Sequence, residues 1–262
     1  MTLTLFDRPA LLFLPASNPR AIAKARASAA DLVVLDLEDA VKPEDKASAR
    51  AASVEALATP WPMPVAIRVN GTATPDHADD LAAAAESRCD FVIIPSVRAV
   101  SDIPILQKPV AAMIESASAV LDAAAIARSC QALIAGTNDL AADLRLPAGA
   151  GRGPMSHALQ HILLCARAAG IAAFDGVFNR LDDLAGFATE AADSRALGFD
   201  GKSLIHPDQI APFHAAFAPS EEELDRARRL VAAASGGAER FEGAMVEAMH
   251  VESARRLLDR YA

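Results

Sequence analysis

The chain has 262 residues, of which 52% are hydrophobic and 23% are charged, so it is long enough to bury the core of one large domain. Its net charge of −9 and its content of one Trp and one Tyr argue against nucleic acid or an anionic membrane surface as a partner. An anionic small-molecule substrate must then be met by local positive charge, chiefly arginine and a metal ion.

The cysteines and the N-terminal segment bear on the cellular compartment. Cys89, Cys130 and Cys165 are odd in number and far apart, which is typical of reduced thiols and not of a disulfide framework. The apolar start of the chain is interrupted by charged residues, so it does not have the pattern of a signal peptide. No apolar run approaches the length of a membrane span. We therefore expect a cytoplasmic protein with no membrane partner.

Apolar segments with the length of β-strands alternate with helical segments along most of the chain. The predicted strands are residues 11–14, 31–37, 65–70, 91–94, 110–114, 131–135, 171–174 and 199–204. The predicted helices between them include residues 19–30, 43–57, 76–87, 117–128, 156–169 and 181–197. This alternation favours an α/β fold with a parallel sheet, and eight strands suit a (β/α)8 TIM barrel. An open doubly wound sheet is the alternative, because a strand count does not show closure.

The last part of the chain exceeds what eight strand–helix units need. Residues 220–234 and 246–260 are helical in pattern and are joined by a Gly-containing turn. We therefore predict a barrel domain over residues 1–218 and a C-terminal helical arm over residues 219–262, which packs on the barrel or on a neighbouring subunit.

Two carboxylates follow neighbouring predicted strands in the middle of the chain. Glu115 comes directly after the strand at 110–114, and Asp139 lies four residues after the strand at 131–135. The carboxyl ends of parallel strands meet at one edge of the sheet, where ligands bind, and two carboxylates there can chelate a divalent cation. We predict that Glu115 and Asp139 hold Mg²⁺. The alternative is that each is an unrelated helix-capping residue.

Charged residues at two earlier strand ends extend this predicted site. Glu38 and Asp39 follow the strand at 31–37, and Arg68 lies near the end of the strand at 65–70. A 2-oxo acid can chelate the metal through its carboxylate and carbonyl oxygens, while Arg68 binds a carboxylate or a developing enolate oxygen. The alternative for Arg68 is a salt bridge to Glu38 or Asp39.

Other motifs do not withstand inspection. His157 and His161 have the spacing of helical zinc ligands, but the Glu of an HExxH site is missing. The GAGRG stretch at residues 149–153 follows no predicted strand, so it does not indicate a dinucleotide-binding loop.

Short motifs spread over nearly the whole chain carry a resemblance to a known family. They are LLFLPASNPR (11–20), DLVVLDLEDAV (31–41), IRVN (67–70), MIES (113–116), AGTNDLAADL (135–144), FDGVF (174–178), GFDGKSLIHPDQI (198–210) and GAMVEAMHVESARRLL (243–258). In this order they resemble the citrate lyase beta-subunit-like family, which includes malyl-CoA, citramalyl-CoA and citryl-CoA lyases. Several matches in order are a more specific signal than any one of them.

The resemblance implies a (β/α)8 barrel that assembles as a homotrimer or hexamer. It implies Mg²⁺ on carboxylates that match Glu115 and Asp139, and contact of Arg68 with the 2-oxo acid and the enolate. Glu38 and Asp39 would act on metal and substrate through water. In the acyl-CoA lyases of this family the C-terminal arm places an Asp in the active site of a neighbouring subunit, and the matching residue here is Glu247.

Three residues depart from the family pattern. Glu247 replaces the usual Asp, Ser96 stands where many members have Lys, and Ala16 replaces a common Gly. Glu247 keeps the carboxylate but extends it by one methylene, which could retune or impair the acid–base step. Ser96 removes a positive charge from the neighbourhood of the predicted site.

The activity implied by the resemblance is Mg²⁺-dependent cleavage, or formation, of a 3-hydroxy-acyl-CoA to acetyl-CoA and a 2-oxo acid, with Arg68 and Glu247 in catalytic roles. One alternative is a CoA-independent, metal-dependent aldolase acting on pyruvate-type substrates. Another is a carrier-dependent citrate lyase beta subunit that is not active alone. The sequence does not choose between glyoxylate, pyruvate and oxaloacetate as the 2-oxo acid.

Overall fold

The computed structural model describes residues 5–7 and 9–261. Residues 1–4, 8 and 262, which belong to the two predicted domains, lie outside the described part. Contacts divide the chain into two compact units, Met1–Ala216 and Phe217–Ala262, and each unit is described by itself. None of the described helices is both long and apolar enough to cross a membrane.

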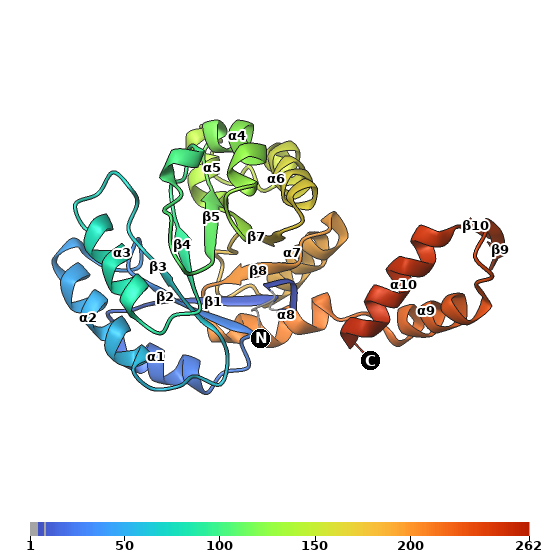
Figure 1. The fold of residues 1–262 in the computed structure, drawn as a ribbon, viewed down its shortest axis with the longest axis horizontal. Helices are drawn as coiled ribbons and strands as arrows, with labels where there is room; N and C mark the ends of the chain where they lie inside the picture. The colour runs from blue at the N-terminus through green and yellow to red at the C-terminus, as the bar shows by residue number, and fades with distance from the viewer. Residues whose placement is uncertain (1–4, 8, 262) are drawn as a thin grey trace. The chain divides into compact units, whose positions relative to one another are not determined.

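The first unit is built on eight parallel strands that close into a barrel (Figure 1). The strands are β1 (Ala10–Pro15), β2 (Leu32–Asp36), β3 (Val65–Arg68), β4 (Phe91–Ile94), β5 (Val110–Ile114), β6 (Ala132–Ala135), β7 (Ala172–Asp175) and β8 (Gly201–Leu204). Each strand pairs with the next in sequence, and β8 pairs with β1 through Leu11 opposite Ser203. This closure confirms the predicted TIM barrel and excludes the open sheet.

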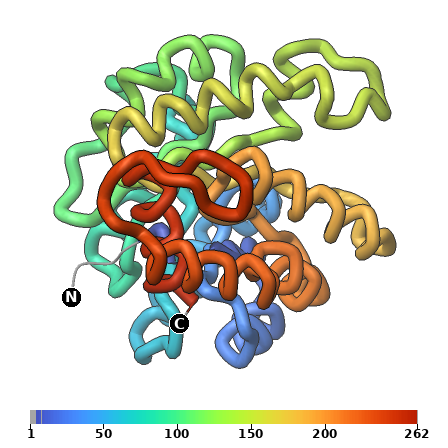
Figure 2. Tube along the Cα trace, turned by 90° about the vertical axis from the view of Figure 1, so that its right-hand side faces the viewer, coloured from blue at the N-terminus to red at the C-terminus, as the bar shows by residue number. Residues whose placement is uncertain are grey.

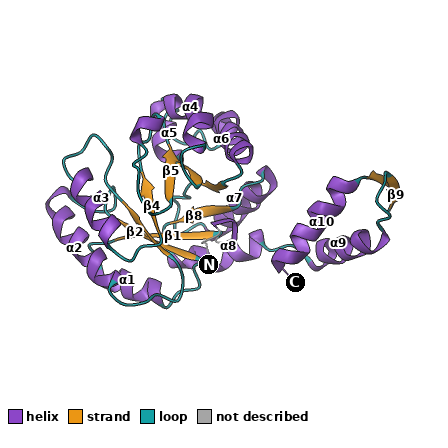
Figure 3. Cartoon of the chain, viewed as in Figure 1, coloured by secondary structure: helices purple, strands orange, loops and turns teal. Residues whose placement is uncertain are grey.

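Helices follow most of the strands and surround the barrel (Figure 3). They are α1 (Pro19–Arg26), α2 (Lys46–Leu57), α3 (His77–Glu86), α4 (Ala117–Ala127), α5 (Thr137–Asp143), α6 (Ser156–Ala169), α7 (Leu184–Leu197) and α8 (Ile210–Phe217). Short 3-10 helices lie at Leu5–Asp7, Pro43–Asp45, Val100–Asp102, Gly153–Met155 and Pro207–Gln209. The sequence reading missed α8, and the β4–β5 connection holds only the 3-10 helix Val100–Asp102.

The inward-facing side chains change from apolar to charged along the barrel axis. Leu32 and Val34 of β2 and Ala66 of β3 belong to the apolar cluster inside the barrel. Side chains on a strand point alternately to its two faces, so the next inward positions are Asp36 and Arg68. Both are the last residues of their strands. The carboxyl end of the barrel is therefore where its buried charge faces inward.

The second unit contains α9 (Glu221–Ala233) and α10 (Ala248–Tyr261), which pack side by side around a small apolar cluster (Figures 1 and 2). A Ser220–Glu223 capping box begins α9, as the sequence pattern Ser-x-x-Glu leads one to expect. The predicted simple turn between the helices is wrong: an antiparallel hairpin of β9 (Glu239–Phe241) and β10 (Ala244–Val246) lies there. These strands have three residues each, too short to show an alternating pattern.

Candidate active site

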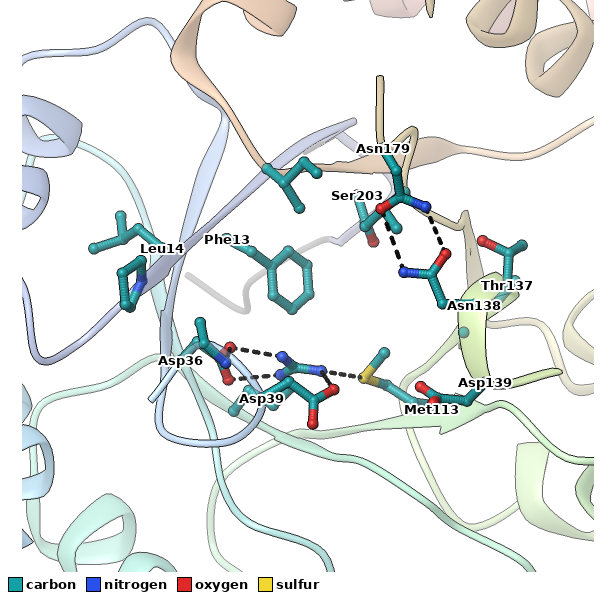
Figure 4. Close-up of a pocket in the computed structure, with 17 residues that line it drawn as sticks. Phe13, Leu14, Asp36, Asp39, Met113, Thr137, Asn138, Asp139, Asn179 and Ser203 are labelled. Carbon is teal, nitrogen blue, oxygen red and sulfur yellow. Dashed lines mark hydrogen bonds and ion pairs between the residues drawn. The ribbon is translucent and has the colours of Figure 1, made fainter. Parts of the chain in front are cut away.

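A pocket of about 320 Å³ opens at the carboxyl ends of the barrel strands (Figure 4). It is lined by Phe13, Leu14, Pro15, Asp36, Asp39, Ala40, Arg68, Met113, Ala135, Gly136, Thr137, Asn138, Asp139, Val177, Asn179, Ser203 and Ile205. This is the end of a parallel barrel at which ligands bind in this architecture. Three of the predicted site residues, Asp39, Arg68 and Asp139, line the pocket itself.

Arg68 is buried and held by several carboxylates. Its Nε and Nη2 atoms donate to the two oxygens of Asp36 at 2.7 and 2.6 Å. Its Nη1 lies 2.7 Å from Oε2 of Glu38 and 3.8 Å from Oδ2 of Asp39. Burial opposes the charge of the guanidinium, but Asp36 and Glu38 more than offset this and raise the pKa of Arg68. Arg68 is thus a fixed cation whose orientation is set by Asp36.

The salt bridge that the sequence offered as an alternative role for Arg68 therefore exists, to Glu38. It does not remove Arg68 from the pocket that it lines. The main partner, Asp36, was missed by the sequence analysis. The signal that could have found it is the alternation along β2, which puts Asp36 on the same face as Leu32 and Val34.

Glu38 shows that the pocket mouth holds more negative charge than its single arginine balances. Burial raises the pKa of Glu38 to about 8, against the lowering effect of Arg68, and the charges of Asp39 and Glu115 add to the rise. The carboxyl group of Glu38 therefore binds a proton more readily than that of an ordinary Glu, although it lies 2.7 Å from Arg68. An added cation would reverse this, because it would neutralise the surrounding carboxylates.

Glu115 directly follows β5, and one half of its carboxylate is fixed while the other half has no partner. Its Oε1 accepts a hydrogen bond from the backbone N–H of Ser96 and another from Ser96 Oγ at 3.0 Å. Its Oε2 is buried without a hydrogen-bond partner. Burial raises the pKa of Glu115, and the negative charge of Asp139 raises it further. The two predicted metal ligands are therefore close enough to repel each other.

Asp139 lies in the first turn of α5, at the edge of the pocket. Burial raises its pKa, and the charge of Asp39 adds to the rise. Gly136, which begins the loop from β6 to α5, permits this arrangement because a Cβ there would overlap the side chain of Glu115. The sequence Gly-Thr-Asn-Asp thus lets a strand end and a helix start bring two carboxylates together.

This donor set fits magnesium. Mg²⁺ prefers oxygen ligands and usually binds through one or two carboxylates, with water and substrate completing the octahedron. Glu115 and Asp139 supply those two carboxylates, and the unpartnered Oε2 of Glu115 is a ligand atom without another role. Within residues 5–7 and 9–261, no group of three or more His, Cys, Asp or Glu side chains could hold a metal.

Ser96 takes a backbone conformation that is uncommon for a residue with a side chain, with φ of +52°. Its backbone N–H and its hydroxyl group both donate to Oε1 of Glu115. Ser96 is thus a positioning group for the predicted metal ligand.

Two other polar residues at strand ends do not belong to the pocket. Asp175, the last residue of β7, pairs with Lys202 at 2.8 Å and with Arg152 at 2.7 Å. Asn70 donates to the carboxylate of Asp80 at 2.6 Å. Neither Asp175 nor Asn70 lines the pocket. Both are buried residues that stabilise the barrel and its loops.

Glu247 lies in the C-terminal unit, between β10 and α10. Its backbone N–H donates to Nδ1 of His250 at 3.0 Å, which closes the first turn before α10. Its predicted catalytic role depends on the active site of a neighbouring subunit and stays a prediction.

The structure thus combines a closed parallel α/β barrel with a buried arginine and several carboxylates at the carboxyl ends of its strands. The chain belongs to the HpcH/HpaI aldolase/citrate lyase family, whose model matches residues 9–207. This confirms the family that the motifs of the sequence indicated.

Relatives with known names cover almost the full chain. A (3S)-malyl-CoA thioesterase of Cereibacter sphaeroides is 37% identical over 264 residues, which are 95% of this chain and 92% of the relative. A citrate lyase subunit beta-like protein of Mycobacterium tuberculosis is 38% identical, over 96% of this chain and 95% of the relative. One of these names denotes a hydrolase and the other a lyase subunit, so family membership alone does not define the reaction.

A solved structure of CitE from Mycobacterium tuberculosis, in complex with magnesium, acetoacetate and coenzyme A, matches with a TM-score of 0.87. It is 37% identical in sequence, and the match covers 96% of this chain and 97% of that chain. Another structure of the citrate lyase beta subunit from the same organism holds oxaloacetate and magnesium, with a TM-score of 0.76 and 34% identity over 82% of this chain. The metal in these relatives is the one that the sequence predicts here.

Proposed function

We propose that the protein is a Mg²⁺-dependent carbon–carbon lyase that cleaves, or forms, a 3-hydroxy-acyl-CoA such as malyl-CoA, citramalyl-CoA or citryl-CoA. The products of cleavage are acetyl-CoA and a 2-oxo acid. One observation carries the proposal: a buried carboxylate oxygen of Glu115 has no partner, and the charges of a second carboxylate, Asp139, and of the guanidinium of Arg68 both act on the pKa of Glu115. The relatives solved with magnesium, oxo acids and coenzyme A support it.

When bound on Glu115 and Asp139, Mg²⁺ would supply a positive charge that polarises the substrate oxygens it holds. In cleavage the substrate's 3-hydroxyl group gives its proton to water, the carbonyl of the 2-oxo acid forms and the adjacent carbon–carbon bond breaks. The electron pair of that bond passes to the thioester half as an enolate. Arg68, held in place by Asp36, stabilises the charge on the enolate oxygen.

Protonation of the enolate carbon completes acetyl-CoA, and in the condensing direction the same carbon loses a proton. We assign this step to Glu247 of an adjacent subunit, on the basis of its match to the catalytic Asp of the family. The assignment requires an assembly in which the arm of one subunit reaches the active site of another, and the resemblance to the family implies that this assembly is a homotrimer or hexamer. A cytoplasmic location suits the three buried, unpaired cysteines, because disulfides are rare there.

The first experiment measures the release of 2-oxo acid from malyl-CoA, citramalyl-CoA and citryl-CoA, each with Mg²⁺ and with a chelator. Metal-dependent release of 2-oxo acid together with acetyl-CoA is the expected result. No release from any thioester by folded, metal-bound protein would overturn the proposal.

The same assay separates the other candidate reactions. The thioesterase among the relatives makes hydrolysis a second candidate, and hydrolysis would release free CoA and a hydroxy acid with no acetyl-CoA. A CoA-independent aldolase would consume pyruvate and an aldehyde but would not bind acetyl-CoA in a calorimetric titration. A carrier-dependent beta subunit would turn over only acyl groups presented on a carrier protein.

A further inference from the structure

The pocket offers very little positive charge for an anionic substrate. Among the described residues that line it, Arg68 is the only cation, and it is already paired with Asp36 and Glu38 at 2.6 and 2.7 Å. Asp36, Asp39 and Asp139 line the same pocket as anions. Each carboxylate that a substrate brings must therefore find its counter-charge at the predicted metal site or at Arg68.

The wall formed by β1, β7 and β8 is neutral. Phe13, Val177 and Ile205 supply its apolar surface. Asn179 faces Asn138 (Figure 4), and their side-chain amides bond to each other, at 2.6 Å from Asn179 Nδ2 to Asn138 Oδ1 and at 3.3 Å in the reverse direction. This wall therefore presents no charged group to a substrate.

Ser203 is a buried polar group of this wall (Figure 4). The residue is 2% exposed, and its Oγ has no hydrogen-bond partner. Leu11, its partner in strand register, belongs to the apolar cluster inside the barrel. A hydroxyl group in such a place can take one neutral oxygen atom or a water molecule, but it adds no charge.

The neighbouring cation is not available to this wall. Lys202 precedes Ser203 on β8 and points to the opposite face of the strand. Its Nζ lies 2.8 Å from both Asp175 and Glu190, and its side chain is fully buried. On β8, therefore, Lys202 pairs with carboxylates outside the pocket, and Ser203 lines the pocket.

Building on the proposed lyase function, we infer that the oxo-acid half of the substrate carries a single carboxylate. The pocket accepts thioesters that release glyoxylate or pyruvate and rejects citryl-CoA, which would release the dicarboxylate oxaloacetate. One carboxylate is met at the metal site, and in the proposed reaction Arg68 is occupied by the enolate oxygen. The second carboxylate of a citryl group would lie against the neutral wall, where hydrogen bonds from Ser203 and from the amides of Asn138 and Asn179 supply no counter-charge.

The inference is tested by comparing kcat/KM for citramalyl-CoA and citryl-CoA with the full-length protein and Mg²⁺. We expect citramalyl-CoA to be preferred by more than about a hundredfold, because a charge buried without a counter-ion is strongly disfavoured. A value for citryl-CoA equal to or above that for citramalyl-CoA would overturn the inference and leave the lyase function intact. If no thioester is cleaved, competition between pyruvate and oxaloacetate in a calorimetric titration with Mg²⁺ still tests it. Tighter binding of oxaloacetate would overturn it.

A charge added to the wall gives the matched test. Asn179 is exposed, so Asn179→Lys should fold, and it brings a cation to the neutral wall. We expect its ratio of citryl-CoA to citramalyl-CoA activity to rise by about tenfold or more, since a paired charge is favoured over an unpaired one. Asn179→Met is the control, because a methionine side chain is nearly as long as that of lysine but carries no charge. Its ratio of citryl-CoA to citramalyl-CoA activity should stay close to that of the wild type. An equal rise in both variants would show that size and not charge excludes the second carboxylate, and would overturn the inference.

Discussion

The barrel holds two groups of buried charges, and they differ in their balance. Behind β7 and β8, Asp175 and Glu190 face Lys202 and Arg152, so that two anions meet two cations. Burial would raise the pKa of Asp175, but Lys202 and Arg152 hold it below its usual value. At the pocket mouth, by contrast, the pKa of Glu38, Glu115 and Asp139 is raised in every case.

The difference separates charges that stabilise the fold from charges kept for a ligand. In the balanced group each ion finds its counter-ion within the chain, and folding alone completes it. For the carboxylates near Arg68 we propose that the counter-charge comes from a bound metal ion or substrate, so that without it their mutual repulsion and burial lower the stability of the protein. Substitutions in the balanced group should therefore lower the free energy of unfolding. Substitutions near Arg68 should instead lower metal binding and turnover.

The largest effect is expected for Glu115→Gln. The variant removes one of two predicted metal carboxylates, so metal-dependent turnover should fall by more than about a thousandfold, since the metal supplies several kcal/mol of transition-state stabilisation. Calorimetric titration should show no saturable Mg²⁺ binding. The metal-free variant should be at least as stable as the wild type, because a buried, repelled carboxylate is gone. A fully active variant that still saturates with metal would contradict the assignment.

Lys202→Met should lower the stability of the protein without weakening its binding of Mg²⁺. It leaves Asp175 and Glu190 without their shared cation, and removing one partner of a buried ion pair costs about 3 kcal/mol or more. Chemical denaturation should show this loss, while the Mg²⁺ affinity of the folded fraction stays near that of the wild type. A variant with wild-type stability would show that the cluster is not a stabilising element.

These two groups also show how far the sequence could be read. The barrel was predictable because eight short apolar segments, such as Leu32–Asp36, alternate with helices. That Glu115 and Asp139 follow neighbouring strands at one end of the barrel was predictable because parallel strands put their carboxyl ends together, while their role as metal ligands stays a prediction. The roles of Asp175 and Lys202 were not, because a charge at a strand end looks the same in the sequence whether it faces the pocket or the helices. The neutral wall likewise depends on which residues meet across β1, β7 and β8.

The excess of negative charge near Arg68 can also be tested through the dependence of protein stability on pH. The folded-state pKa of Glu38 is raised to about 8 from 4.5, so the folded protein binds one more proton than the unfolded chain between these values. The stability of the metal-free protein should therefore fall as pH rises from about 4.5 to 8, by at most about 1.4 kcal/mol per pH unit from this group. Denaturant titrations at several pH values measure the slope. In Glu38→Gln the slope should shrink, and a slope equal to that of the wild type would contradict the pKa of Glu38.

The smallest effects are expected for two serines, each of which donates a hydrogen bond to a carboxylate in one of the two groups of buried charges. Ser96 donates to Glu115, and Ser194 donates to Asp175. Ser96→Gly keeps the backbone N–H and suits the positive φ, and it removes the side chain whose hydroxyl group donates to Glu115. It should weaken Mg²⁺ binding by about tenfold, as the loss of an outer hydrogen bond to a metal ligand does, with little change in unfolding free energy.

Ser194→Ala should cost about 1 kcal/mol of stability, the net value of one hydrogen bond, and leave the Mg²⁺ affinity unchanged. Calorimetry gives the Mg²⁺ affinity of each variant, and denaturant unfolding gives its free energy of unfolding. If Ser194→Ala weakened metal binding as much as Ser96→Gly, the two groups would be coupled and the distinction between them would fail. Separate effects would instead show that the barrel keeps its stabilising charges apart from those that it holds for a ligand.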